Sequence, residues 1–273
     1  GFRISEFRCC FTCTEPISPM SILEKILDAK RDELQDVRAP SGRVKKFDHV
    51  RSLNEALKNP DISVIAEIKM KSPSEGDILP NADPVQIAKD YESAGAAAIS
   101  VLTDRQFFGG SLTILESVRE AVSIPVLCKD FIIHEHQIMD LAQARADAYL
   151  LIAEALQKTK MAELYSYGIE LGLEALVEFH DEENAKRIAE INSLIVGVNC
   201  RNLKTMTTDI SYFEKMIAFL PDHAVKVAES GIYSSSDLNY VADLGYDAVL
   251  VGTSLMKTGK PGMALERLLG GVA

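Results

Sequence analysis

The chain has 273 residues, of which 47% are hydrophobic and 25% are charged, and this is the composition of a folded globular protein. Its formal net charge of −11 excludes the basic surface by which proteins bind nucleic acids or anionic membranes. No apolar stretch approaches the roughly 18 residues that a membrane-spanning helix needs. We therefore expect a cytoplasmic protein with a small-molecule partner, and a local positive field in a pocket would still allow that molecule to be an anion.

The first 19 residues differ from the rest of the chain. They lack the apolar run and the small-residue cleavage site of a secretory signal peptide, and they are short and carry two glutamates, unlike an organelle transit peptide. Met20, which follows, starts a stretch with helical periodicity. We expect residues 1–19 to be a non-native or disordered leader and residues 20–273 to form one domain.

The five cysteines divide between two regions. Cys9, Cys10 and Cys13 lie in the leader, whereas Cys128 and Cys200 lie in apolar stretches. This is no disulfide framework, and the two inner cysteines are typical of buried thiols in a reducing compartment. Cys10 and Cys13 have the spacing of a metal-binding pair, but no second pair follows, so no metal is expected.

Residues 20–60 begin with MSILEKILDAKRDEL and predict a helical extension that caps one end of the domain. Eight short apolar runs follow, separated by stretches with helical periodicity: SVIAEIK, AAAISVL, IPVLCKDF, DAYLLIA, LEALVEF, LIVGVN, AVKVAES and DAVLVG. Apolar strands alternating with helices indicate a parallel sheet in an α/β protein. Eight such units predict a (β/α)8 TIM barrel, and a doubly wound open sheet, the alternative, would not normally need eight repeats.

Polar residues recur where the predicted strands end, which is where such barrels place their active sites. In chain order they are Glu67, Lys69, Lys129, Glu178, Asn199, Arg201, Glu229, Ser230, Gly252 and Thr253. Glu67 alone could equally belong to a structural ion pair, and the Lys129 ammonium could simply reach the rim. Burying charge is costly, however, and its recurrence around the barrel favours an active site.

Small residues follow the last two strands, in ESGI and VGTS. Loops at this point of a (β/α)8 barrel commonly bind phosphate through backbone N–H groups. Gly231 and Gly252 would allow an anion to approach the backbone, and Ser72 in the SPS segment would add a hydroxyl. Two ordinary tight turns are the alternative interpretation.

Other polar residues are expected to have no role in chemistry. His134, His136 and His180 share no metal-ligand spacing and are expected to be surface histidines. Asp104 and Arg105, after the second strand, are expected only to start a turn.

Six segments together closely resemble the indole-3-glycerol phosphate synthase family: AEIKMKSPSEG, VLCKDFII, LVEFH, VGVNCRNL, VAESGI and VGTSLM. The resemblance extends from about Met20 to about Leu269. It implies a lyase of the tryptophan pathway that closes an indole ring on 1-(2-carboxyphenylamino)-1-deoxyribulose 5-phosphate, releasing carbon dioxide and water. It also implies that no metal or organic cofactor takes part and that the protein is a monomer or a weak homodimer.

The resemblance implies a role for each site residue. Lys129 matches the general acid that protonates the substrate ketone, and Glu178 matches a carboxylate that transfers protons. Glu67 and Lys69 match a catalytic pair implicated in dehydration. The residues that match substrate-binding positions are Asn199, Arg201, Glu229 and Phe131, and those that match the phosphate site are Ser72, Ser230, Gly231, Gly252 and Thr253.

A general acid near neutral pH works best with a lowered amine pKa, and we expect Lys69 and burial to lower that of Lys129. Two positions depart from the family pattern, Cys200 in place of a common asparagine and Glu75 in place of a common basic residue. Two rival functions stay open: an aldose–ketose isomerase on a related barrel, which uses a different acid–base pair, and a non-catalytic phosphate binder.

Overall fold

The computed structural model describes residues 20–37, 46–48, 50–202 and 205–270. The predicted leader, residues 1–19, lies outside the described residues, and so do the three cysteines within it. Among the residues that are described, no helix is long and apolar enough to cross a membrane.

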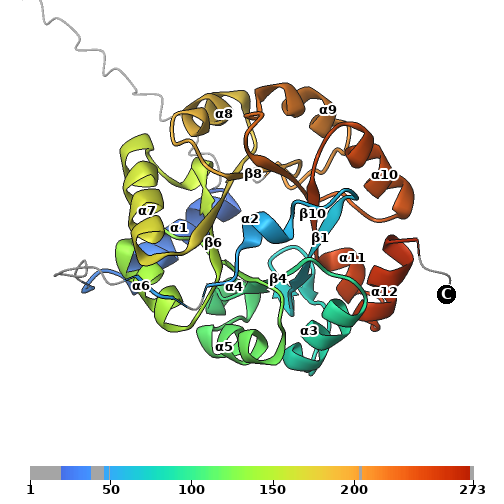
Figure 1. The fold of residues 1–273 in the computed structure, drawn as a ribbon. Coiled ribbons are helices and arrows are strands. Elements are labelled where there is room, and N and C mark those ends of the chain that lie inside the picture. Colours follow the sequence, from blue (N-terminus) through green and yellow to red (C-terminus); the bar gives the residue numbers. More distant parts are fainter. Residues whose placement is uncertain (1–19, 38–45, 49, 203–204, 271–273) are drawn as a thin grey trace, which may run out of the picture.

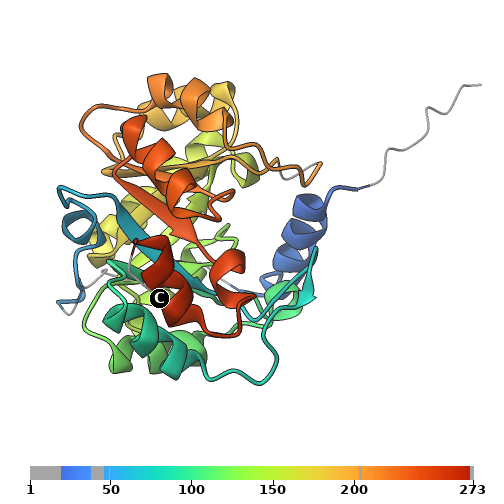
Figure 2. The ribbon, with the colours of Figure 1, turned by 90° about the vertical axis from the view of Figure 1, so that its right-hand side faces the viewer.

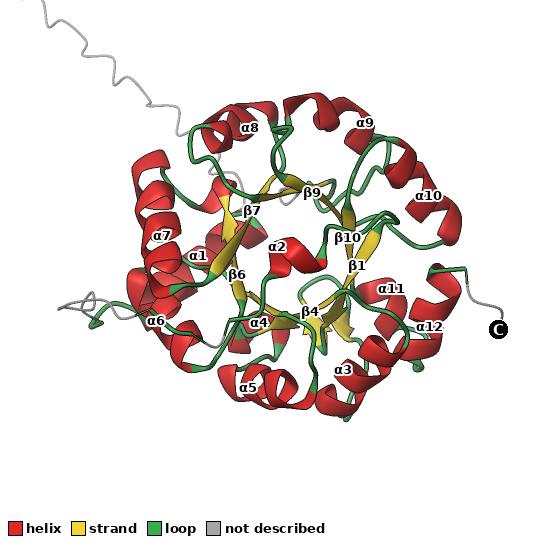
Figure 3. Cartoon of the chain, viewed as in Figure 1, coloured by secondary structure: helices red, strands yellow, loops and turns green. Residues whose placement is uncertain are grey.

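Eight parallel strands close into a barrel in the order β1-β10-β9-β8-β7-β6-β5-β4 (Figures 1 and 3). They are β1 (Ser63–Ile68), β4 (Ala98–Leu102), β5 (Val126–Lys129), β6 (Ala148–Ile152), β7 (Glu174–Phe179), β8 (Ile195–Asn199), β9 (Val225–Glu229) and β10 (Ala248–Val251). A short antiparallel pair, β2 (Lys71–Ser72) and β3 (Gly76–Asp77), follows β1. The predicted (β/α)8 barrel is therefore confirmed.

Helices surround the barrel on its outer side (Figure 3). They are α3 (Pro84–Ser93), α4 (Arg105–Phe108), α5 (Leu112–Ala121), α6 (Glu135–Gln143), α7 (Lys158–Leu171), α8 (Glu182–Ala189), α9 (Tyr212–Met216), α10 (Ser235–Asp243), α11 (Thr253–Met256) and α12 (Pro261–Leu268), with 3-10 turns at Ala153–Ala155 and Ile217–Phe219. Side-chain caps begin several of them: Asp83 accepts from the Val85 N–H at 2.9 Å. At the other end of a helix, Gly172 closes α7 with φ 94°, a conformation that suits glycine.

The core has two parts because strand side chains alternate between the faces of the sheet. The larger part lies between strands and helices, with Val64, Ala66 and Ile68 of β1 among its members. The smaller part fills the barrel interior, where Ile65 of the same strand is fully buried. The packed interior side chains therefore fix the positions of the strands on which the carboxyl-end residues lie.

The extension before β1 contributes to both ends of the barrel, not to one end as predicted. The short helix α2 (Leu53–Ala56) closes the amino end, where Leu53 and Leu57 belong to the interior core. Helix α1 (Ile22–Glu33) lies at the opposite end, where Ile22 lines the cavity formed by the carboxyl ends of the strands. Figure 2 shows the two helices on opposite sides of the barrel, with α1 in dark blue.

Candidate active site

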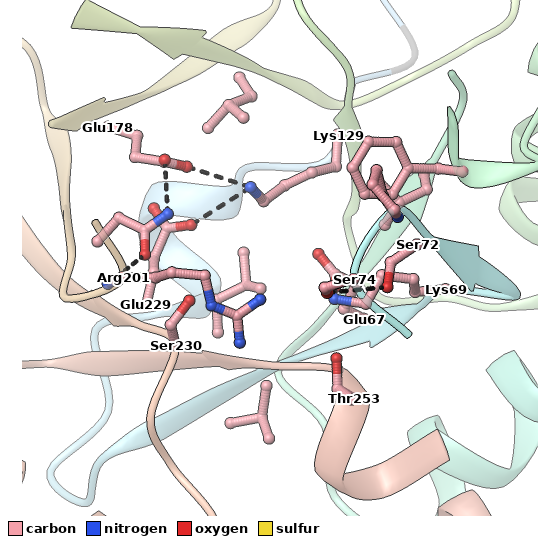
Figure 4. A pocket seen from close by; sticks show the side chains of 18 of the residues that line it. Glu67, Lys69, Ser72, Ser74, Lys129, Glu178, Arg201, Glu229, Ser230 and Thr253 are labelled. Atoms are coloured by element: carbon pink, nitrogen blue, oxygen red, sulfur yellow. Dashed lines mark hydrogen bonds and ion pairs between the residues drawn. The ribbon is translucent and has the colours of Figure 1, made fainter. Parts of the chain in front are cut away.

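A cavity opens at the carboxyl ends of the strands, and we call this end of the barrel the mouth. All thirteen residues predicted for the site line this cavity: Glu67, Lys69, Ser72, Lys129, Phe131, Glu178, Asn199, Arg201, Glu229, Ser230, Gly231, Gly252 and Thr253. They come from six strands and the segments that follow them, and many are drawn in Figure 4. The topology therefore brings the whole predicted set together at one place.

Lys129, at the end of β5, lies among buried carboxylates. Its Nζ is 3.1 Å from Glu178 Oε2 and 3.5 Å from Glu229 Oε2, and Figure 4 shows both contacts crossing the cavity. The side chains of Glu178 and Glu229 are only 3% and 2% exposed. The ammonium is thus held by side chains of two other strands, Glu178 on β7 and Glu229 on β9.

The expected lowering of the Lys129 pKa is wrong for this structure. Burial disfavours the charged amine, but the carboxylates of Glu178, Glu229 and Glu67 outweigh burial and raise the pKa of Lys129 above its ordinary value. The sequence argument considered Lys69 and burial, but it did not consider the charges of these three carboxylates. Lys129 is therefore a charged ammonium at neutral pH, able to donate a hydrogen bond or a proton.

The two carboxyl groups beside Lys129 differ from each other. Burial and the nearby Glu178 charge raise the pKa of Glu229 well above its ordinary value. For Glu178, burial acts in the same direction, but Lys129 and the hydrogen bond from Asn199 outweigh it and lower the pKa. Of the two, Glu229 therefore holds a proton more strongly than Glu178.

Asn199, at the end of β8, orients Glu178. Its Nδ2 donates to Glu178 Oε1 at 2.8 Å, and its Oδ1 accepts from the Arg201 backbone N–H at 3.0 Å. The Arg201 side chain donates to Thr208 Oγ1 at 3.2 Å, which directs the guanidinium along the rim of the cavity. Asn199 therefore contributes to the carboxylate's position as well as to the cavity wall.

Glu67 and Lys69 form a second pair on β1 and the segment after it. Lys69 Nζ is 2.8 Å from Glu67 Oε1. Burial would raise the pKa of Glu67, but Lys69 and then Lys129 reverse this and hold it below the ordinary value. Both charges of the strand-one motif thus face the cavity, with Lys69 on the side of Ser72 in Figure 4.

Two glycines make room for these carboxylates: Gly197 in β8 and Gly252 directly after β10. A Cβ on Gly252 would lie 2.4 Å from Glu67 Oε1, and a Cβ on Gly197 would lie 2.3 Å from Glu229 Oε1. Real Cβ atoms do not approach oxygen this closely, so both positions exclude larger residues. Gly252 therefore has a packing role beside its predicted one, and Gly197 is a site residue that the sequence argument missed.

The rim after β9 has an unusual backbone. Ser230 has φ 72° and Gly231 has φ 75°, and a serine in this left-handed region indicates a conformation imposed by its surroundings. A Cβ on Gly231 would meet Cys200 Sγ at 3.0 Å and Thr208 Cγ2 at 3.1 Å. Across the rim, the buried Ser72 hydroxyl accepts from the Glu75 N–H at 3.2 Å, which leaves its proton to donate elsewhere.

The opposite side of the cavity is apolar. Phe131 and Phe108 have ring centroids 6.1 Å apart, and both line the cavity. Ile22, Leu23 and Ile26 of α1 complete this side. Phe108 and the α1 residues were missed, although the i, i+4 spacing of Ile22 and Ile26 is a recognisable signal of one helix face.

The expectation that His180 is a surface histidine with no role in chemistry stays a prediction, and its side chain is partly exposed. The His180 ring is 4.9 Å from the Tyr212 ring, nearly parallel to it, and Nδ1 lies 2.8 Å from the Asn199 carbonyl. Its backbone N–H donates at 2.7 Å to Glu154, a partly buried residue that was not considered. Asp104 does begin a turn as expected, because its Oδ1 accepts from the Phe107 N–H at 2.7 Å. No group of three or more possible metal ligands occurs within the described ranges.

A closed (β/α)8 barrel with a lysine between buried carboxyl groups at its mouth defines the class of the protein, a barrel enzyme built for acid–base chemistry. Among solved structures, the chain resembles N-acetylmannosamine-6-phosphate 2-epimerase from Clostridium perfringens. That similarity has a TM-score of 0.58 at 14% identity and covers 80% of this chain and 96% of the other, so it supports the fold alone.

Sequence comparison identifies the family. The family model of indole-3-glycerol phosphate synthase matches residues 23–268. The indole-3-glycerol phosphate synthase of Halalkalibacterium halodurans is 44% identical over 254 residues, which are 92% of this chain and 97% of that protein. That of Bacillus thuringiensis subsp. konkukian is 46% identical over 237 residues, 86% of this chain and 93% of that protein. The chain belongs to the indole-3-glycerol phosphate synthase family.

Proposed function

We propose that this chain catalyses ring closure, decarboxylation and dehydration of 1-(2-carboxyphenylamino)-1-deoxyribulose 5-phosphate to indole-3-glycerol phosphate, the lyase reaction EC 4.1.1.48 of tryptophan biosynthesis. The observation that carries this proposal is the Lys129 ammonium, fixed between Glu178 and Glu229 at the mouth. Family membership and the close grouping of all predicted site residues support the same reaction.

In the first step, Lys129 is the general acid. The ring carbon that bears the carboxylate attacks the ketone carbon, and the electrons of the C=O bond move to its oxygen. The oxygen then takes a proton from the Lys129 ammonium. The raised pKa of Lys129 keeps the amine protonated at rest, and a developing alkoxide is basic enough to accept the proton.

Carbon dioxide then leaves, and its bonding electrons restore the aromatic ring. The Glu178 carboxylate, 3.1 Å from Lys129, is placed to take or return protons through that amine. The hydrogen bond from Asn199 holds Glu178 in this orientation. These contacts support a proton-transfer role for Glu178.

Dehydration completes the indole. The former ketone carbon loses its hydroxyl as water, and the methylene carbon beside the nitrogen loses a proton. Glu67 and Lys69, 2.8 Å apart, supply a base and an acid for this step. In this proposal, the two pairs serve the two halves of the reaction.

The substrate lies across the cavity in this proposal. Its phosphate binds on the side of Ser72, Ser230, Gly231, Gly252 and Thr253, where glycines allow backbone N–H groups to reach an anion. Its aromatic ring packs against Phe131, and Arg201, Asn199 and Glu229 contact its polar groups. Every proposed residue comes from one chain, so a monomer or a weak homodimer suffices.

The test is direct turnover. The purified chain is incubated with the carboxyphenylamino-deoxyribulose phosphate, and indole absorbance and fluorescence are followed. The chain contains no tryptophan, so an indole signal can come only from the product. Product formation by wild-type protein and its loss in Lys129→Met are expected. Aldose–ketose isomerisation of a sugar phosphate, or binding without product, would instead support one of the two rival functions.

A further inference from the structure

A buried lysine of the extension reaches into the barrel mouth. Lys30, in the last turn of α1, has a side chain that is only 7% exposed. Its Nζ lies 3.0 Å from Asp104 Oδ2 and 3.0 Å from Asp130 Oδ1, on two different βα segments. Glu33 of the same helix lies 3.3 Å from it at the surface. Burial disfavours the Lys30 ammonium, but the two aspartates reverse this and raise its pKa, so the cluster is ionic.

Both aspartates are joined to residues of the cavity. Asp130 follows Lys129 in the chain, and its Oδ1 accepts from the Phe131 N–H at 2.7 Å. Its Oδ2 accepts from Thr103 Oγ1 at 2.7 Å. Asp104 holds the first turn of α4 through the N–H groups of Phe107 and Phe108. Lys30 thus pairs with two aspartates that hold the backbone of Phe131 and Phe108. These two aromatic rings and the apolar residues of α1 form one side of the cavity, which we call the apolar wall. One of the aspartates, Asp130, is also the chain neighbour of Lys129.

The apolar residues of helix α1 lie outside the main hydrophobic core. The two hydrophobic clusters of the described residues contain no residue from α1. Ile26 and Leu27 are buried, yet Ile22, Leu23 and Ile26 face the cavity instead of a packed core. Figure 2 shows α1 standing at the mouth beside the barrel. The Lys30 ion cluster links this helix to two βα segments of the barrel.

We propose that Lys30 is a positioning residue, which docks α1 on Asp104 and Asp130 and so completes the apolar wall that holds the substrate's aromatic ring against Lys129. The inference rests on the proposed function for the identity of that ring. The docking itself rests on the ion cluster alone.

Lys30 has a second effect on the same residues. Without it, Asp104 and Asp130 would be two buried carboxylates with no counter-charge in the cluster, a costly arrangement. Asp130 would then be free to turn toward cations of the mouth, of which Lys129 is adjacent in the chain. Loss of Lys30 would therefore disturb the ring-binding wall and the acid together, while the phosphate side of the cavity stays as it is.

The experiment compares Lys30→Met, Lys30→Arg and a control on the same helix, Lys25→Met, whose side chain is exposed. Hydrogen exchange of the full chain measures whether residues 22–33 stay docked. For Lys30→Met we expect faster exchange in α1, a higher KM and a fall of kcat/KM on the order of 10-fold to 100-fold, as for a misplaced reacting group. The inhibition constant of inorganic phosphate should change less than twofold.

Lys30→Arg should recover most of the activity, because a guanidinium can still pair with both aspartates, and Lys25→Met should match wild type. Unchanged α1 exchange in folded Lys30→Met would overturn the docking. Faster α1 exchange with an unchanged kcat/KM would overturn the positioning role. The same role would be overturned if the inhibition constant of phosphate rose by as large a factor as the KM of the substrate. If wild type makes no indole product, the proposed function fails, and the exchange measurement still decides whether Lys30 docks the helix.

Discussion

Both ends of the barrel bury charged residues, but they pair them differently. At the amino end, Asp147 accepts four hydrogen bonds or ion-pair contacts: Arg51 N at 2.7 Å and Arg119 Nη2 at 2.9 Å on one oxygen, and Val126 N at 2.9 Å and Arg119 Nε at 2.7 Å on the other. Glu174 likewise accepts from Ser52 Oγ and Asn54 N, each at 2.7 Å. Each oxygen of these two carboxylates therefore has at least one donor.

At the mouth the pairing is incomplete. Neither oxygen of Glu229 has a hydrogen-bond partner within the part of the chain that the structure describes, and the nearest cation, Lys129, is 3.5 Å away. A buried polar group left in this state costs stability, so its presence requires another explanation. The comparison teaches that buried charge alone does not mark an active site. Incomplete pairing beside a cavity is the better indicator, and in the function proposed above the substrate would supply the missing partner.

The largest effect is expected at the mouth, from Lys129→Met. The substitution keeps the length of the side chain and removes the proton, so kcat should fall by about 10²–10⁴ while KM changes much less. Steady-state kinetics of the folded variant measure this. Lys89→Met, at an exposed lysine, is the control and should keep wild-type kcat. Near-normal kcat in Lys129→Met would transfer the acid role to Lys69.

A substitution at the amino end should instead lower the stability and leave the activity nearly unchanged. Asp147→Asn turns an amide N–H₂ toward two donors and leaves the Arg119 charge uncompensated, which should lower the free energy of unfolding by about 3–5 kcal/mol. Urea denaturation measures the loss, and Asp222→Asn, at an exposed aspartate, is the control. At a temperature where the variant is folded, its kcat/KM should stay within about twofold of wild type, since Asp147 lies at the far end from the cavity. A large catalytic loss in the folded variant would break the distinction between the two ends.

A third prediction tests the phosphate side of the mouth. Gly231→Val would bring a side chain against Cys200 and Thr208, where a Cβ alone is 3.0–3.1 Å from its neighbours, and should raise KM about tenfold or more by blocking approach to the backbone. Inorganic phosphate should inhibit the variant correspondingly less. Gly245→Val also has a positive φ, 94°, but nothing lies within 4 Å of its Cβ, so it controls for backbone strain. An unchanged KM in Gly231→Val would place the phosphate elsewhere.

The sequence predicted the parts of the molecule that depend on strand periodicity. Once eight βα units are recognised, parallel strands must end at one face, and residues such as Glu178 and Glu229 must meet there although 51 positions separate them in the chain. Continuous apolar runs made the strand ends easy to locate. This is why every predicted site residue lines the cavity.

Other features depend on distances that periodicity does not supply. The docking that we propose for α1 depends on contacts of Lys30 with Asp104 and Asp130, three residues with no common spacing. The direction of the Lys129 pKa shift depends on which charges surround the amine, and the sequence argument, which counted Lys69 and burial but not the carboxylates, predicted the wrong direction. Gly197 likewise shows its role only when the Glu229 carboxyl group is seen against it.

The smallest effect concerns the pH dependence of stability, and it separates the two carboxyl groups beside Lys129. Because the pKa of Glu229 is raised by folding, the folded state binds more protons than the unfolded state above pH 4.5, the ordinary value. Wild-type stability should therefore fall as pH rises from about 4.5 toward the folded pKa of Glu229, by at most about 1.4 kcal/mol per pH unit. Glu229→Gln removes this dependence, so its stability relative to wild type should rise with pH.

Glu178→Gln is the matched comparison, with the opposite sign. The pKa of Glu178 is lowered by folding, so its carboxylate contributes stability above pH 4.5 that is lost as pH falls through the folded pKa. Glu178→Gln should therefore be less stable than wild type at pH 7, whereas Glu229→Gln should be as stable or more stable, even though both lose activity. Urea denaturation between pH 4 and pH 8 measures both differences. If the two variants shift in the same direction, Glu229 does not hold a proton more strongly than Glu178.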